Sequence, residues 1–175
     1  MADENRAASL AAYGLLAVAV AVLQTTLFAR LHILGTIPLM TYAATVCVAM
    51  FEGEQTGALF GLLTGYCIDV TASAVFGRTA LILMLAGYAA GYLARTLILQ
   101  SLTSAASLYG LAHGLVIAGD LLLRLLVTFS LAGFGGAALA QLRLAAVSLP
   151  YLPLFYLIVR RLGRAFGRPE YGVTP

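Results

Sequence analysis

Residues 57–73 read GALFGLLTGYCIDVTAS, an apolar run in which a glycine or a polar residue returns at every fourth position. The repeating positions are Gly57, Gly61, Gly65, Asp69 and Ser73, and Gly53 extends the series by one step. Residues four apart lie on one face of an α-helix, with a drift of about 40° per step. Glycines on such a face let a neighbouring backbone approach closely, which is how helices pack in lipid. The run therefore predicts a membrane helix with a glycine face.

A second glycine pair, Gly87 and Gly91, repeats the spacing in the next apolar run, and Gly77 lies between the two runs. Two interpretations of these glycine faces stay open. They pack against each other within the chain, or they form the interface for a partner helix. Asp69 also has two interpretations, because an ionisable residue inside a membrane is costly and its presence suggests function. It either caps the loop that follows its helix or acts on a substrate or proton.

The composition supports a membrane protein. Of the 175 residues, 62% are hydrophobic and 10% are charged, whereas soluble domains have about 45–50% apolar and about 25% charged residues. The net charge of +3 comes from dispersed arginines, which argues against nucleic-acid binding. The chain has no P-loop, H-E-x-x-H or G-x-S-x-G motif and no cluster with metal-ligand spacing. We therefore expect no enzyme activity, and no catalytic, cofactor-binding or metal site.

Six apolar runs are long enough, or nearly so, to span a membrane, which needs about 20 residues. They cover approximately residues 7–28, 33–51, 57–73, 79–99, 103 into the 120s, and 144–159. The fold class is therefore all-α, with about six transmembrane helices in one domain, 1–162, and a short basic tail, 163–175. The segment 120–143 is interrupted, so the fifth helix is either long and tilted or followed by a short interfacial segment.

The arginines predict the orientation. An even number of spans puts both termini on one side, and arginine is enriched in cytoplasmic loops. Six arginines fall on the side of the termini and three on the other, with Arg124 left out as intramembrane. We therefore expect both termini in the cytoplasm, and a C-terminal basic cluster that attracts anionic membrane lipids.

Polar residues form a stripe along the fifth run. Tyr109, His113, Asp120 and Arg124 lie close to one helical face, and Asp120 and Arg124 are four residues apart. Such a stripe suits a proton relay in a transporter. It also suits a hydrogen-bonded interhelical network or an Asp–Arg pair at the membrane surface, which we favour. In the sixth run, Pro150 and Pro153 predict a kink.

Several segments resemble the MreD family of rod shape-determining membrane proteins. The matching residues are 23–28 (LQTTLF), 61–73 (GLLTGYCIDVTAS), 76–81 (FGRTAL) and 87–93 (GYAAGYL). The chain departs from the family's pattern at Leu39, where Asp often follows Pro38, and at Glu52-Gly53-Glu54, where the family's loop is often basic.

The resemblance implies a fold similar to the substrate-binding subunits of energy-coupling-factor transporters. It also implies a location in the bacterial inner membrane and a role as a non-enzymatic scaffold in cell wall elongation. The implied partners are MreC directly, and RodA, its penicillin-binding transpeptidase and MreB in the same rod complex, which supports peptidoglycan synthesis and cell shape. Two other functions stay open: a vitamin-type binding subunit of a transporter, and a small proton-coupled permease that uses His113 and Asp120.

Overall fold

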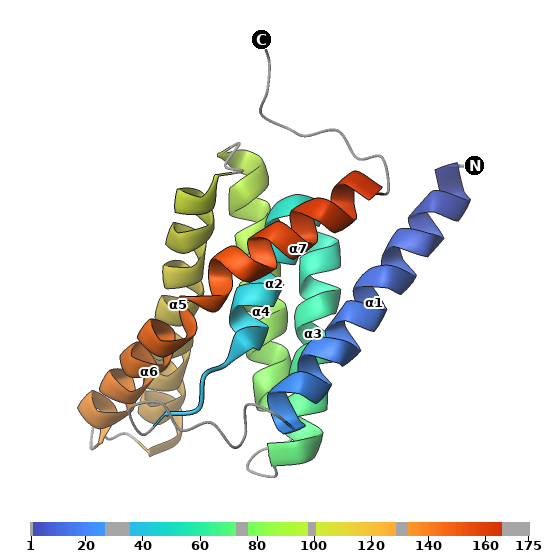
Figure 1. Ribbon diagram of the computed structural model, residues 1–175. Coiled ribbons are helices and arrows are strands. Elements are labelled where there is room, and N and C mark those ends of the chain that lie inside the picture. The colour runs from blue at the N-terminus through green and yellow to red at the C-terminus, as the bar shows by residue number, and fades with distance from the viewer. Residues whose placement is uncertain (1, 27–35, 73–76, 98–100, 129–132, 166–175) are drawn as a thin grey trace.

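The computed structural model describes residues 2–26, 36–72, 77–97, 101–128 and 133–165. Within these ranges the chain forms seven helices, and all of its regular secondary structure is helical, as expected. The helices are α1 Ala2–Thr26, α2 Met40–Glu52, α3 Glu54–Ala72, α4 Arg78–Thr96, α5 Leu102–Thr128, α6 Phe134–Ser148 and α7 Tyr151–Ala165. They form one bundle with α2 at its centre (Figure 1).

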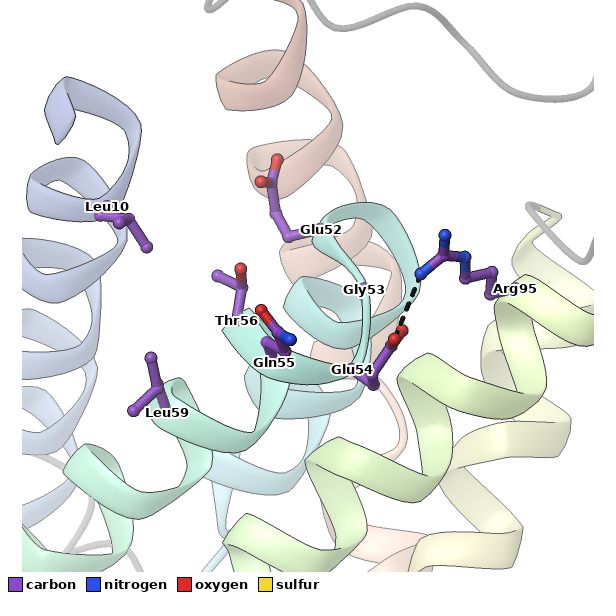
Figure 2. Close-up of a pocket in the computed structure, with 8 residues that line it drawn as sticks. All are labelled: Leu10, Glu52, Gly53, Glu54, Gln55, Thr56, Leu59 and Arg95. Atoms are coloured by element: carbon purple, nitrogen blue, oxygen red, sulfur yellow. Dashed lines mark hydrogen bonds and ion pairs between the residues drawn. The ribbon is translucent and has the colours of Figure 1, made fainter. Parts of the chain in front are cut away.

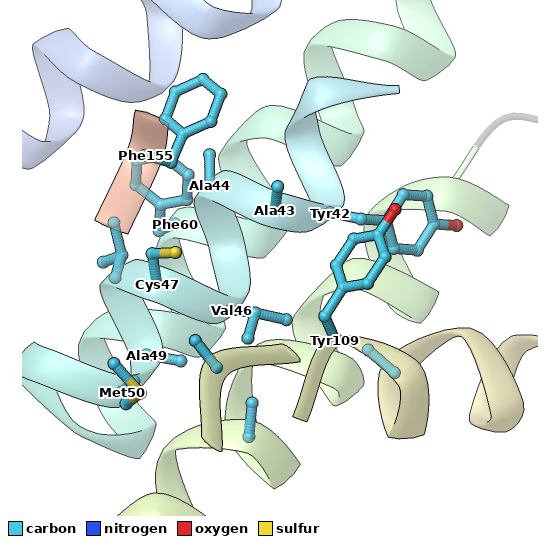
Figure 3. Close-up of a cluster of buried hydrophobic side chains, with 14 of the residues drawn as sticks. Tyr42, Ala43, Ala44, Val46, Cys47, Ala49, Met50, Phe60, Tyr109 and Phe155 are labelled. Atoms are coloured by element: carbon cyan, nitrogen blue, oxygen red, sulfur yellow. The ribbon is translucent and has the colours of Figure 1, made fainter. Parts of the chain in front are cut away.

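The central helix α2 is short, and most of its side chains are small. Every residue from Met40 to Met50 is buried, and Figure 3 shows how Val46, Cys47 and Ala49 lie among side chains from the surrounding helices. Phe60 of α3, Tyr109 of α5 and Phe155 of α7 complete this core. Small side chains on a central helix let several neighbours approach it closely, so α2 holds the bundle together.

Two ends of the bundle can be distinguished. The end called here the Glu52 end contains the α2–α3 turn, the carboxyl end of α4, the amino end of α1 and the carboxyl end of α7 (Figure 1). The hydroxyl of Tyr13 on α1 donates a hydrogen bond of 2.8 Å to Glu52 there, and Arg95 forms an ion pair of 3.2 Å with Glu54. The opposite end contains the beginnings of α2 and α4. Successive helices from α1 to α5 therefore alternate in direction.

The last apolar run differs from the prediction of one helix over 144–159. Helix α6 already begins at Phe134, and it is separated from α7 by Leu149 and Pro150 with a bend of 56°. Pro150 explains the break, because it has no N–H to donate and its ring clashes with the carbonyl four residues earlier. Leu149 before it keeps helical dihedral angles, with φ −56° and ψ −40°. Pro153 is tolerated because it falls in the first turn of α7, where N–H groups have no partner within the helix.

Two described helices are long and apolar enough to cross a membrane by length and composition. These are Ala8–Thr26 of α1 and Leu102–Gly119 of α5, and the bent pair α6 and α7 would make a third if it acts as one span. Helix α5 continues to Thr128. This agrees with the expectation of a long fifth helix. Helix α7 extends to Ala165, so the first three residues of the expected tail are helical.

Candidate functional site

The glycines of α3 and α4 face each other inside the chain. A Cβ atom added to Gly61 would overlap the carbonyl of Leu83, and one added to Gly65 would lie 2.5 Å from the Cα of Ala80. Gly57 and Gly87 oppose each other in the same way, backbone to backbone. Real Cβ atoms do not approach other atoms this closely, so only glycine allows the observed separation of the two helices.

Gly91 extends this contact to the Glu52 end. A Cβ there would lie 2.5 Å from the backbone nitrogen of Glu54, at the α2–α3 turn. Gly53 itself has a φ of +90°, a left-handed value that favours glycine, and it separates α2 from α3. The glycine faces are thus occupied within the chain, which agrees with the first of the two interpretations above. They are not a free surface for a partner helix.

Asp69 caps the next helix. Its side chain is buried, at 7% exposure, and its two carboxylate oxygens accept hydrogen bonds from the N–H groups of Thr79 (3.2 Å) and Ala80 (3.0 Å). These are the second and third residues of α4, whose N-terminal N–H groups have no partner within the helix. The residue at the cap position, Gly77, has no side chain to offer and a φ of +89°. Asp69, which lies eight residues before Gly77, therefore takes the role of the missing capping side chain.

His113 lies in an aromatic cage. It is 2% exposed, and its ring lies 4.7 Å from that of Tyr42 in a stacked arrangement and 4.6 Å from that of Tyr109 at an angle of 65°. Nδ1 of His113 is 2.9 Å from the amide nitrogen of Gln141, on α6. Within the described residues, Nε2 has no hydrogen-bond partner. The cage thus joins α2, α5 and α6 at one histidine.

The structure gives no side-chain contacts for three of the residues predicted from the sequence. Ser73 lies outside the described residues, and the side chains of Asp120 and Arg124 are likewise not described, although both residues belong to α5. Their proposed pairing therefore stays a prediction. Of the polar stripe, the structure brings Tyr109 and His113 together, and the Tyr109 hydroxyl donates to the carbonyl of Ala145 at 3.2 Å.

Two further polar side chains hold the beginning of α2, and the sequence reasoning missed their role. Gln24 of α1 accepts from the N–H of Met40 (2.9 Å) and donates to the carbonyl of Pro38 (2.8 Å). Ser148 of α6 accepts from the N–H of Leu39 (2.8 Å). Both side chains are buried. A glutamine within an apolar run could have indicated this role, because a polar side chain that becomes buried needs hydrogen-bond partners in the fold.

A pocket of about 330 Å³ opens at the Glu52 end (Figure 2). Its walls come from α1, the α2–α3 turn, the beginning of α3 and the end of α4. The lining residues are Leu10, Glu52, Gly53, Glu54, Gln55, Thr56, Leu59 and Arg95. The Glu54 side chain is 20% exposed and that of Arg95 is 77% exposed. The pocket thus combines charges of both signs with apolar side chains at one end of the bundle.

No protein-family model, no curated protein and no solved structure matches this chain. Within the described residues no group of three or more His, Cys, Asp or Glu side chains is placed to hold a metal ion. The glycines, Asp69, Gln24, Ser148 and Gln141 all make contacts that join one helix to another. These contacts hold the helices in fixed positions relative to one another.

Proposed function

We propose that this chain is a six-span membrane scaffold similar to MreD, which holds the single-pass protein MreC within the rod complex and catalyses no reaction. The proposal rests on what the residues that resemble the family do in this structure. Gln24, Asp69 and the spaced glycines of α3 and α4 are all engaged in contacts that fix helices to one another. A rigid helix pair of this kind suits a protein whose task is to present a surface.

The outward face of α4 is the surface that we assign to the partner. Leu81, Leu85, Tyr88 and Tyr92 are spaced four, three and four residues apart, and each is more than half exposed. Tyr88 lies about 15 Å along α4 from Arg78, which is near the middle of a bilayer if α4 spans it. A phenol hydroxyl at that depth is costly when it faces lipid alone, and a partner helix can supply its hydrogen bond.

The proposed topology extends the two or three apolar helices to six spans. Helices α3 and α4, with 19 residues each, reach about 28 Å, close to the thickness of the hydrocarbon core. Helices α1 to α5 alternate in direction, and the carboxyl end of α7 lies beside the amino half of α1 at the Glu52 end. This arrangement supports both termini on the cytoplasmic side of the bacterial inner membrane.

The proposal is tested by co-purification with MreC from the same cells, together with cell shape. Tyr88→Ala combined with Tyr92→Ala is expected to reduce MreC recovery at least about tenfold while the protein still inserts. Leu15→Ala on α1 is the control, because Leu15 is 73% exposed on another helix. Unchanged MreC recovery and rod shape in the double variant would exclude the α4 face. Failure of the unmodified chain to recover any MreC would exclude the scaffold function.

A further inference from the structure

Helices α6 and α7 are joined at a bend but are held in the protein in different ways. Each is 15 residues long. Helix α7 crosses the bundle over α2 (Figure 1) and buries four side chains, those of Leu152, Phe155, Tyr156 and Val159. Helix α6 lies beside α5, and of its 15 residues, all of which the structure describes, only Ser148 is buried. Apolar packing therefore anchors α7 but not α6.

Hydrogen bonds from one face attach α6 to the bundle. Gln141, Ala145 and Ser148 are four and three residues apart, which places them on the same side of the helix. The amide nitrogen of Gln141 lies 2.9 Å from Nδ1 of His113. The carbonyl of Ala145 accepts from the Tyr109 hydroxyl at 3.2 Å, and the hydroxyl of Ser148 accepts from the N–H that precedes α2 at 2.8 Å. The contacts of α6 with α5 and α2 are thus largely polar.

We propose that α6 is a hinged helix, which moves outward as one body about Leu149 and Pro150 while α7 stays in place. The three hydrogen bonds form its latch, and the attached position seen in the structure is the more populated one. Segments with few buried apolar contacts open at a small free-energy cost. The break supplies the hinge, because Pro150 has no N–H to continue α6 into α7. The inference does not depend on MreC or on the number of spans.

Movement of α6 changes the interior of the bundle. It separates the Leu39 N–H from Ser148, so that Gln24 of α1 is left to hold the beginning of α2. It also uncovers the Tyr109 hydroxyl and the ring of His113, whose Nε2 has no hydrogen-bond partner among the described residues. A molecule that supplies hydrogen bonds to these groups binds the displaced position preferentially and shifts the population toward it.

Double electron–electron resonance on the full chain in nanodiscs measures the movement. One spin label replaces Leu63 on α3, and the second replaces either Leu142 on α6 or Leu157 on α7, all three of which are exposed. Cys67→Ser removes the partly exposed native thiol, and Cys47 is fully buried. The Leu142 pair is expected to show a second, displaced population, and the Leu157 pair is expected to show a single distance.

Removal of the latch is expected to enlarge the displaced population. Gln141→Leu and Ser148→Ala each remove one hydrogen bond and are each expected to raise the ratio of displaced to attached α6 about threefold, the effect of one average interhelical bond in a membrane. Ser107→Ala is the matched control, because the Ser107 hydroxyl donates to a carbonyl of its own helix. A single distance for the Leu142 pair in the unmodified chain and in both variants would overturn the proposal. Equal displacement of the Leu157 pair would also overturn it, because α7 would then not be fixed.

Hydrogen exchange in the unmodified chain provides a second test, which needs no substitution. The N–H groups of Leu39 and Met40 are neighbours, but the first bonds to Ser148 on α6 and the second to Gln24 on α1. If α6 moves alone, the Leu39 N–H is expected to exchange at least about threefold faster than the Met40 N–H, after correction for their intrinsic rates. Equal protection of the two groups would contradict a hinged α6.

Discussion

Asp69 Oδ2 accepts a hydrogen bond of 3.0 Å from the backbone N–H of Ala80, so that a carboxylate near the end of α3 closes the first turn of α4. Gly65 of α3 lies against the same residue, where any Cβ would meet the Cα of Ala80. The hydrogen bond and the close backbone contact therefore fix the same point of the α3–α4 pair. The hydrogen bond depends on the close contact, because the carboxylate reaches α4 only if the helices approach closely.

The cap predicts graded effects at Asp69. Asn offers one carbonyl oxygen for the two N–H groups and turns an amide N–H toward the other, so Asp69→Asn is expected to destabilise the protein by about 1–2 kcal/mol. Asp69→Ala removes both acceptors and is expected to cost more. Thermal unfolding in detergent measures both variants. Equal stability of the two would show that the carboxylate does not act as a cap.

The glycine contact predicts a position-specific effect of alanine. Gly61→Ala places a methyl group against the backbone of Leu83 and is expected to destabilise the protein by about 1–3 kcal/mol. Gly14 of α1 is the matched control, because a Cβ there meets nothing within 4 Å. Gly14→Ala is expected to be neutral or to stabilise by up to about 1 kcal/mol. Similar melting temperatures for the two variants would contradict the close contact.

The beginning of α2 predicts that Gln24 is sensitive to substitution. Gln24→Leu keeps the apolar part of the side chain but leaves the Met40 N–H and the Pro38 carbonyl without their partner. A buried unsatisfied group costs about 1–3 kcal/mol. Thr25→Val is the control, because among the described residues Thr25 bonds only to carbonyls of its own helix. Hydrogen exchange of the first turn of α2 is expected to increase in Gln24→Leu alone.

The aromatic cage predicts a mild structural effect at His113. Gln at this position can still hydrogen-bond to Gln141 but loses the two ring contacts, each of which contributes about 0.5–1.5 kcal/mol. If the protein is a scaffold, His113→Gln keeps MreC recovery and rod shape despite a lower melting temperature. Loss of rod shape with the complex still assembled would instead support a proton-linked or ligand-binding role.

The even number of proposed spans and the excess of arginine on the side of the termini together predict a cytoplasmic C-terminus. A reporter that is active only in the cytoplasm, fused after residue 175, is expected to be active, and a periplasm-specific reporter is expected to be silent. A third fusion, inserted at Gly77 in the turn before α4, is expected to show the opposite pattern. A periplasmic C-terminus would exclude the proposed orientation, and together with a cytoplasmic N-terminus it would mean an odd number of spans.

The sequence by itself determined the helical class, the presence of helices long and apolar enough to cross a membrane, and the spacing of the special residues. Apolar runs and a four-residue glycine repeat are local properties, because the geometry of a helix converts spacing along the chain directly into a shared face. The proline pair in the last run likewise predicted a bend. It did not predict a full break between α6 and α7, since that outcome depends on whether neighbouring helices satisfy the freed backbone groups.

Only the tertiary structure decided what each special residue touches. The glycine faces of α3 and α4 were compatible with an internal contact or a partner, and the packing of the two helices against each other decided for the first. Gln24 and Ser148 meet at the beginning of α2 from helices more than one hundred residues apart in the chain, and Leu10 lines a pocket with Arg95. Such contacts arise from the order in which helices pack. In lipid that order is set by shape and by buried hydrogen bonds, which no local pattern encodes.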